Sequence, residues 1–478
     1  MTLRKLRFHL IIIAVSACAC LSLISLHINK ADWIQLPNVL SYDDASNGRV
    51  SHLHLLTVAT DSNLNLCRLI FSSTVLSYPV PVLIDWKGSG EFNASESHLA
   101  KIEGPLRYLR SLPPHKDNDI VLLVDGYDVI FQLGPDVLLQ RYFSVLDEAN
   151  TRLRAKFGDD YVEKSGIYNS IIFGPDKTCF PLEHSHPRCW AVPPSPLPPD
   201  AFGPNTDKDM EHHRPRWLNS GTIMGPVAEV RAFFQATKDK VKDTFDPDNI
   251  SRNSDQMYMA NLFADQEYAR TIFAPGQPEL PNTEDKIIPD LNDGRRKEFH
   301  VGLDYESRMF QTCAGYEGFL DWTTFDQPSP HSNLKSPSSK GIISLQEDVL
   351  SSRKPFAAID DDKALRDTSW TSVSLGVNMV SGFIFPVLHF TSDKSLRDRW
   401  WPRMWFYPHA ERLLVACSKI KKSLISNQLI NGTRWMNDEP YNIQEGNVGY
   451  IGAVSDLGEH LSWKKICGEH EETLYSAE

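Results

Sequence analysis

The sequence predicts an α/β protein in which a mostly parallel central sheet is flanked by helices. Short apolar or β-rich runs alternate with segments of helical periodicity between about residues 54 and 263. Residues 120–124 read Ile-Val-Leu-Leu-Val, as expected of a strand buried on both faces of a parallel sheet. Hydrophobic residues make up 41% of the 478 residues and charged residues 23%, which is typical of a globular chain.

The expected elements follow in order along the first part of the chain. A β-rich run at 54–60 is followed by a helix over 66–76, for which Asp61 or Ser62 is the expected cap. A short strand at 80–84 precedes a helix at 99–109, where apolar residues recur every three or four positions although Gly104-Pro105 interrupts them. After the strand at 120–124, Pro135 occupies the first turn of a helix that extends to residue 143.

The second half continues the pattern with less regularity. Apolar runs at 171–173 and 383–388 are expected strands, and helices are expected at 226–244 and 255–263. The proline-rich segment 192–199 indicates an extended surface loop, and the Ser/Pro-rich segment 326–340 a loop or boundary. Strands that alternate with helices indicate right-handed crossovers between parallel strands.

The amino terminus predicts a membrane anchor. Arg4, Lys5 and Arg7 precede an uncharged run at 8–29, which is long enough for the about 20 residues of a spanning helix. Because basic residues stay on the cytosolic side, the pattern predicts a single-pass type II protein. The expected domains are a cytosolic tail (1–7), a signal-anchor (8–29), a stem (30–50), a luminal domain (51–410) and a carboxyl-terminal extension of open role (411–478). Alternatively, Ala17-Cys18-Ala19 marks the cleavage site of a signal peptide.

Cysteines, sequons and charge agree with export. Six cysteines lie outside the apolar run, and they are Cys67, Cys179, Cys189, Cys313, Cys417 and Cys467. They allow three disulfides in several connectivities, of which Cys179–Cys189 is the favoured pair because a short loop separates its members. N-glycosylation sequons occur at Asn93, Asn249 and Asn431. The net charge of −12 disfavours nucleic acid as a partner.

Two aspartates after the buried strand are the first candidates for chemistry. Asp125 and Asp128 are three residues apart on a turn that contains Gly126, at the carboxyl end of the strand, where open α/β sheets bind ligands. Their oxygens could hold Mg²⁺ or Mn²⁺, which bridges diphosphate oxygens, and Tyr127 could present its ring to a base. The ordinary alternative is an acidic turn that ends a strand.

Four further residues are candidates on weaker signals. His389 follows an apolar strand and could complete a metal shell, Asn219 lies in a Gly-containing elbow and could bind a sugar hydroxyl, and Asp255 and Asp176 could activate an acceptor. Each has a structural alternative: a packed histidine, a turn, a carboxylate that favours a helix start, or a strand end.

Other chemistries find little support. The sequence lacks the nucleophile elbow GxSxG, the phosphate loop GxxxxGK[ST] and the zinc motif HExxH. Four histidines, His184, His186, His212 and His213, could form a zinc cluster, but their spacing matches no known ligand pattern.

Taken in order, the motifs resemble the glycosyltransferase domain of procollagen lysyl hydroxylases and the related collagen galactosyltransferases. The resemblance runs from about residue 53 to 394. The matching elements are 56–60 (Leu-Thr-Val-Ala-Thr), 85–88 (Asp-Trp-Lys-Gly), Lys101, 125–128 (Asp-Gly-Tyr-Asp), 171–181, 218–221 (Leu-Asn-Ser-Gly), Asp255-Gln256, 303–311 and 386–389 (Pro-Val-Leu-His).

The resemblance implies a GT-A fold, Mn²⁺ or Mg²⁺ as cofactor and a UDP-sugar donor. Its metal ligands would be Asp125, Asp128 and His389. Its donor-binding residues would be Thr57, Thr60, Trp86, Lys101 and Tyr127, with Tyr127 stacked on uracil. Asp255, Asp176 and Asn219 would serve the transfer itself.

The chain departs from that pattern after His389, where Phe390-Thr391-Ser392 replaces a glycine-containing sequence. We therefore expect a metal-dependent glycosyltransferase that moves a hexose from a UDP-sugar to a hydroxyl of a protein or glycan, anchored in the Golgi or ER membrane with its catalytic domain in the lumen. The alternative is a non-catalytic luminal module of the same fold that binds glycan or protein. No dioxygenase signature follows residue 410, so lysine hydroxylation is not expected.

Overall fold

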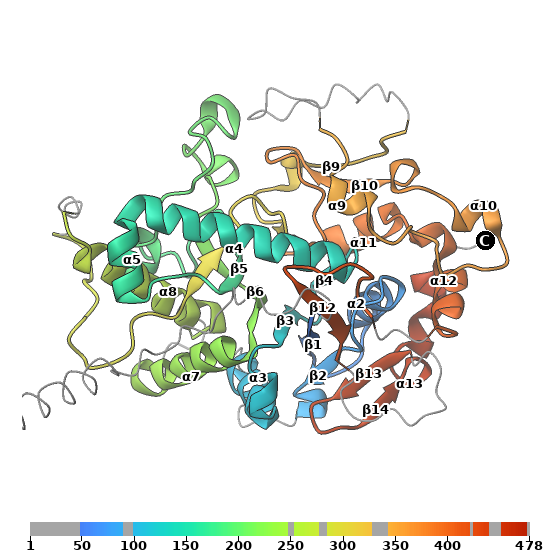
Figure 1. Ribbon diagram of the computed structural model, residues 1–478, viewed down its shortest axis with the longest axis horizontal. Coiled ribbons are helices and arrows are strands. Elements are labelled where there is room, and N and C mark those ends of the chain that lie inside the picture. Colours follow the sequence, from blue (N-terminus) through green and yellow to red (C-terminus); the bar gives the residue numbers. More distant parts are fainter. Residues whose placement is uncertain are drawn as a thin grey trace, which may run out of the picture. The chain divides into compact units, whose positions relative to one another are not determined.

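The computed structural model describes residues 48–88, 99–246, 253–276, 284–326, 343–420, 424–438 and 451–475. From Arg49 to Glu478 the chain forms one compact unit (Figure 1). The expected tail, anchor and stem fall almost wholly outside the described residues, as do the loop at 327–340 and the sequons at Asn93 and Asn249. Within the described ranges, no helix is both long and apolar enough to cross a membrane.

A mixed, mostly parallel sheet lies at the centre of this unit, as predicted. Its strands run in the order β14-β13-β2-β1-β3-β6-β5-β7, and β12 also pairs with β1. The bounds are β1 Arg49–Val58, β2 Val82–Ile84, β3 Ile120–Asp125, β5 Ile171–Asp176, β6 Trp217–Pro226, β7 Val301–Leu303, β12 Thr433–Asn437, β13 Gly452–Ser455 and β14 His460–Ser462. Because β6 is antiparallel to both β3 and β5, these two strands run the same way and their carboxyl ends share one edge.

Both faces of the sheet are covered by apolar cores. Along β3, Ile120, Leu122 and Val124 join one core, whereas Val121 and Leu123 join the other. The first core contains α2 (Leu64–Val75), the first half of α4 (Pro135–Phe157) and α12 (Ala410–Cys417), and the second contains α3 (Ala100–Ser111), α7 (Val227–Thr244) and α8 (Asp255–Phe273). Alternating side chains with both faces buried explain the unbroken apolar run of β3.

The helices agree with the predicted periodicity but differ at their ends. α2 is capped by Asn63, whose side chain accepts from the amides of Asn65 and Leu66, so the predicted cap at Asp61 or Ser62 was wrong. Asp61 instead pairs with Lys87. α4 and α8 extend well past residues 143 and 263. Their later turns are more polar, so the apolar periodicity used for the prediction did not include them.

Helix α3 forms despite Gly104-Pro105. A Cβ at position 104 would overlap Asp85 Oδ2 and Ile84 Cγ2, so glycine permits the close packing of α3 on the end of β2. Leu106 and Leu109 are fully buried beyond the proline, and this burial compensates for the hydrogen bond that Pro105 cannot donate.

Two smaller sheets lie beside the central one. β4 (Val129–Phe131), β11 (Val387–His389) and β8 (Phe310–Thr312) form the first, in which β11 is antiparallel to β4 and parallel to β8. β9 (Leu320–Thr323) pairs with β10 (Leu375–Asn378). The remaining short helices include α5 (Asp159–Ser165), α6 (Pro187–Trp190), α9 (Glu347–Leu350), α10 (Lys363–Arg366), α11 (Leu396–Trp400), α13 (Trp463–Cys467) and α14 (Glu471–Leu474).

The carboxyl-terminal segment 411–478, whose role the sequence leaves open, completes the central sheet. It supplies β12 to one half of β1 and β13 to β2. A disulfide between Cys67 and Cys467 joins α13 to α2. The predicted disulfide between Cys179 and Cys189 is confirmed. Cys313 and Cys417 are free buried thiols, so the cysteines within the described ranges form no third disulfide.

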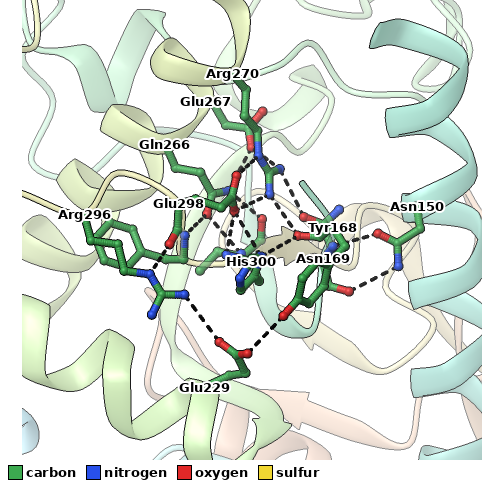
Figure 2. Close-up of polar contacts among 12 residues, drawn as sticks. Asn150, Tyr168, Asn169, Glu229, Gln266, Glu267, Arg270, Arg296, Glu298 and His300 are labelled. Atoms are coloured by element: carbon green, nitrogen blue, oxygen red, sulfur yellow. Dashed lines mark hydrogen bonds and ion pairs between the residues drawn. The ribbon is translucent and has the colours of Figure 1, made fainter. Parts of the chain in front are cut away.

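A buried polar network holds the amino-terminal ends of β5 and β7, at the edge of the sheet away from Asp125 (Figure 2). Arg270 of α8 donates to both oxygens of Glu298, to Glu267 and to the Asn169 side chain, over 2.7–3.1 Å. Gln266 accepts the amides of Phe299 and Val301. These bonds fix the position of β7 relative to α8 and leave the carboxyl ends of the strands free for a site.

Candidate active site

Asp125 and Asp128 lie where β3 gives way to β4. Asp125 is the last residue of β3, and Asp128 directly precedes Val129, the first residue of β4. The turn between them packs closely on β1, since a Cβ at Gly126 would overlap the carbonyl oxygen of Val58. A glycine is therefore required for the two carboxylates to stand together at this edge.

His389 reaches these carboxylates through strand pairing. It is the last residue of β11 and lies opposite Val129 in the antiparallel β4–β11 pair, and the amide of Phe390 donates to the carbonyl of Asp128 over 2.8 Å. Ligand atoms of Asp125, Asp128 and His389 all lie within 4.8 Å of one another, which no other group of three His, Cys, Asp or Glu side chains in the described ranges achieves. The structure thus brings together the three residues that the resemblance assigns to the metal.

The surroundings of His389 suit a ligand of a divalent cation. Its Nε2 stands 3.7 Å from Asp125 Oδ2, too far for a hydrogen bond but close to the roughly 3 Å between neighbouring ligands of an octahedral ion. A Cβ at Gly221 would overlap His389 Cε1 and stand 2.6 Å from its Nε2, so glycine in β6 leaves the space that the imidazole occupies. Burial lowers the pKa of His389 to about 4 against the pull of Asp125 and Asp128, which leaves the ring neutral at pH 7.

Among the residues that the structure describes, three side-chain cations contact the two carboxylates. Lys101 of α3 donates to Asp125 Oδ1 over 2.7 Å. Lys394 donates to Asp128 Oδ2, and Arg397 of α11 donates to Asp128 Oδ1 over 2.8 Å. Burial disfavours the Lys101 ammonium, but the charges of Asp125 and Asp255 outweigh it and raise its pKa.

Lys394 and Arg397 were missed by the sequence reasoning. Two basic residues spaced three apart soon after a candidate ligand histidine are the signal that could have found them, because residues i and i+3 at a helix start share a face.

A second buried group lies at the same edge, at the end of β5. Asp176 Oδ2 accepts from the side-chain amides of Asn219 over 3.0 Å and Gln256 over 3.2 Å, while its buried Oδ1 has no hydrogen-bond partner within the described part of the chain. Burial raises the pKa of Asp176 to about 6, although both amides favour the ionised form. A buried carboxylate poised near neutrality with one free oxygen can accept a proton from a bound hydroxyl.

Asn219 and Asp255 surround this carboxylate. The Asn219 side chain also accepts the amide of Gly221 over 3.0 Å, which links the Asp176 group to the glycine beside His389. Asp255 is a buried first residue of α8, in the turn capped by Ser254, and its charge acts on Lys101. Asp255, Asp176 and Asn219 therefore lie at the same edge of the sheet as the three candidate metal ligands.

The residues expected at the nucleoside lie along the end of β1. The Tyr127 hydroxyl accepts the amides of Thr60 and Asp61 over 2.9 and 3.0 Å, so the ring is fixed against this loop and half-buried. Trp86 is buried beside the same loop, where Lys87 donates its amide to the Thr60 carbonyl. Thr57 is fully buried and its hydroxyl donates to the Val124 carbonyl over 3.3 Å, an inward contact between strands.

The four loop histidines do not converge. His186 pairs with Glu183 over 3.0 Å, His212 with Asp209 over 2.7 Å, and His213 contacts the Lys177 carbonyl over 3.1 Å. His184 belongs to no metal-binding group within the residues described. His186 and His212 each pair with an acidic residue three positions earlier, and His213 contacts a backbone carbonyl, which argues against a zinc cluster.

Comparisons with known proteins point to the same kind of domain. Residues 49–156 match the family model described as the PLOD GT domain. The chain is 24% identical over 268 residues to the "Multifunctional procollagen lysine hydroxylase and glycosyltransferase" of Caenorhabditis elegans, and the aligned region covers 55% of this chain and 26% of that protein. It is 22% identical over 289 residues to "Procollagen-lysine,2-oxoglutarate 5-dioxygenase 1" of Gallus gallus, covering 59% of this chain and 28% of that protein. The matched regions span about a quarter of each relative, and the resemblance to the glycosyltransferase domain is confirmed.

Proposed function

We propose that this chain, which resembles the glycosyltransferase domain of procollagen lysyl hydroxylases, is a metal-dependent glycosyltransferase that moves a hexose from a UDP-sugar to a hydroxyl of a protein or glycan. The observation that carries the proposal is the convergence of Asp125, Asp128 and His389 at the carboxyl end of the central strand. Hard oxygen ligands and a neutral imidazole fit Mn²⁺ or Mg²⁺. A bound divalent cation would supply stabilisation of the negative charge that develops on the departing diphosphate.

The chain's own residues would divide the remaining work. Tyr127, Thr60 and Trp86 would border the nucleoside, with Thr57 behind them in β1. Lys101 would neutralise part of the diphosphate charge. Its contact with Asp125 already places its ammonium at the edge of the candidate metal site.

The acceptor side would be formed around Asp176. Asn219 and Gln256 hold this carboxylate, and Asn219 also reaches the backbone of Gly221. Asp176 or Asp255 would take the proton of the acceptor hydroxyl. The half-ionised state of Asp176 near pH 6 supports it as base, whereas Asp255 is placed by the start of α8 beside Lys101.

We also propose that the protein works in the secretory pathway as a single-pass type II protein of the Golgi or ER membrane. Two disulfides support an oxidising compartment, and the relatives are named as modifiers of procollagen. The anchor at 8–29, with a cytosolic tail before it and a stem after it, is part of this proposal. So are N-glycans at Asn93, Asn249 and Asn431, of which Asn431 is exposed.

The test is UDP-sugar hydrolysis by the purified full-length protein, across a panel of UDP-hexoses, with and without Mn²⁺. Wild type should release UDP only with the metal, and Asp128→Ala should lose at least about a hundredfold of that rate. Hydrolysis that ignores both the metal and the substitution would contradict the mechanism.

A second candidate is a non-catalytic binding module of the same fold. It is favoured by the segment after His389, where Phe390 is fully buried and Ser392 adopts a left-handed φ of 68°, a conformation that suits glycine. Calorimetry separates the two: no heat of binding with millimolar UDP and Mn²⁺ would favour the module.

A further inference from the structure

The side-chain cations around Asp128 suggest how the cation and the donor would bind. Both oxygens of Asp128 are occupied, since Lys394 donates to Oδ2 and Arg397 donates to Oδ1 over 2.8 Å. At Asp125, Lys101 occupies Oδ1, and only Oδ2 faces His389. Three of the four carboxylate oxygens that a divalent cation could use are therefore already engaged by positive charges.

The contacts of Arg397 are directed at the turn that carries the ligands. Its Nη1 donates to the Tyr127 carbonyl as well as to Asp128, each over 2.8 Å, and its side chain is only 20% exposed. Its Nε donates to the Lys394 carbonyl over 3.0 Å, and Lys394 Nζ also donates to the Phe390 carbonyl over 2.9 Å. The two cations thus support each other and link α11 to both β3–β4 and the end of β11.

A divalent cation entering alone would face unfavourable charge. It would compete with Arg397 and Lys394 for Asp128 and would stand a few ångströms from them, so repulsion between like charges would weaken its binding. A diphosphate changes this balance, because its oxygens accept from guanidinium and ammonium groups and can draw both away from the carboxylate.

We propose that Lys394 and Arg397 couple the two binding steps: they hold Asp128 while the donor is absent and turn to the diphosphate when it arrives, so that cation and donor each strengthen the binding of the other. This inference rests on the proposed function and adds to it two positioning residues and a thermodynamic linkage. Removal of a competing side-chain cation should therefore raise the affinity for Mn²⁺ alone. Because the coupling free energy is shared by both ligands, the same removal should reduce the gain in affinity that each ligand gives the other.

The test measures the affinity for Mn²⁺ itself, by electron paramagnetic resonance of the free ion, on the full-length protein with and without saturating UDP. In Arg397→Gln, Mn²⁺ alone should bind at least about fivefold more tightly than in wild type, and the gain in Mn²⁺ affinity caused by UDP should shrink by a similar factor. Lys394→Gln, at a half-exposed side chain, should likewise raise the affinity for Mn²⁺ alone and reduce the gain in Mn²⁺ affinity caused by UDP. Arg397→Lys keeps the charge and should stay close to wild type in both measurements.

The matched control is Arg399→Gln, which removes the same charge from the same helix. Arg399 pairs with Glu317 and Asp393 and does not contact the site carboxylates, so both affinities should equal those of wild type. If the wild-type protein binds Mn²⁺ and UDP, but Arg397→Gln binds Mn²⁺ alone no better than wild type, the coupling is overturned. The proposed function would still stand in that case. Absence of Mn²⁺ binding in wild type, with and without UDP, would overturn both.

Discussion

Among the single residues of the site, Asp176 is the one whose burial should determine how the rate of transfer depends on pH. Its pKa is raised to about 6 because the carboxylate is buried, and the amides of Asn219 and Gln256 oppose the shift by donating to the charged form. If Asp176 takes the acceptor proton, only the ionised form works. We predict that kcat rises with pH through about 6 and is level above pH 7.

Substitution of Gln256 tests that assignment. Gln256→Met removes one donor to the carboxylate, so the midpoint of the pH profile should move up by about 0.5 to 1 unit. Gln428→Met, at an exposed glutamine, is the control and should leave the midpoint in place. A profile that stays flat between pH 5 and 7, together with an active Asp176→Asn variant, would show that Asp255 or another group is the base.

The residue scale also shows what could be predicted from sequence. The candidate ligands Asp125, Asp128 and His389 were identified because each follows an apolar strand and stands in a motif shared with the resembled glycosyltransferase domain. Lys394 and Arg397 were not, because their role depends on how the chain turns after β11, and their spacing of three residues does not by itself report that turn. The inward hydroxyl of Thr57 was not foreseen either, since strand direction alone does not say which face it takes.

At the scale of elements, β6 brings a glycine against the candidate metal site. In Gly221→Ala the new Cβ would overlap the imidazole of His389 and stand 2.9 Å from Asp125 Oδ2. We predict at least a tenfold loss of Mn²⁺ affinity, with a loss of about 1 to 3 kcal/mol in the free energy of unfolding. Titration with Mn²⁺ and urea unfolding measure the two effects.

The control for this prediction is in the same strand. Gly225→Ala places a Cβ 3.1 Å from Ile171 Cγ1 and 3.2 Å from backbone atoms, away from the site. It should reduce stability without changing Mn²⁺ affinity. Equal affinity for Mn²⁺ in both variants would mean that His389 does not need the space that Gly221 leaves.

A buried histidine joins β12 to the sheet and makes stability depend on pH. His54 of β1 has no exposed surface on its side chain and lies 3.2 Å from Asp119 and 3.0 Å from Asp438, which follows β12. Lys116 contacts Asp438, and His52 lies 3.6 Å from Asp119. Burial alone would lower the pKa of His54, but the two carboxylates outweigh it and raise the pKa.

The sign of the pH effect follows from these shifts. The contribution of charged His54 is complete below its unfolded pKa of about 6.5 and is lost as pH rises through the higher folded value. The pKa of Asp119 and Asp438 is lowered, so their contribution is complete above about 3.8 and is lost at lower pH. Stability from this group is therefore greatest between about pH 4 and 6.5.

We predict that His54→Gln lowers the free energy of unfolding by about 3 kcal/mol at pH 5.5 and by clearly less at pH 9. Urea unfolding at both values measures it. His52→Gln, at a side chain that is 38% exposed, should cost far less at either pH. A His54→Gln cost that does not change with pH would contradict the charged pairing.

At the scale of the whole molecule, the carboxyl-terminal segment is held to the amino-terminal half by a covalent bond. The Cys67–Cys467 disulfide closes a loop of 400 residues and joins two helices of the same core. We predict that Cys67→Ser/Cys467→Ser lowers the free energy of unfolding by about 4 kcal/mol, and that Cys179→Ser/Cys189→Ser, which opens a ten-residue separation, costs less. Thermal melting of both double variants beside wild type would test the order, and the reverse order would contradict it.

The fold class was predictable at this scale, and the completion of the sheet was not. Alternating strands and helices with a fully apolar central strand predict an α/β sheet from local pattern. The pairing of β12 with β1 joins residues nearly 400 positions apart. β12 and β13 are short, and short sequences of this kind do not by themselves specify a strand or its partner. The antiparallel direction of β6 likewise depends on its packing between β3 and β5, which periodicity does not report.

We propose above that Asp125, Asp128 and His389 hold a divalent cation beside a UDP-sugar. Anomalous diffraction at the manganese edge, from crystals of the protein grown with UDP and MnCl₂, tests it most directly. We expect one strong peak about 2.2 Å from an oxygen of each aspartate and from His389 Nε2, in contact with the diphosphate. A crystal that contains UDP but shows no manganese peak at these three residues would contradict it.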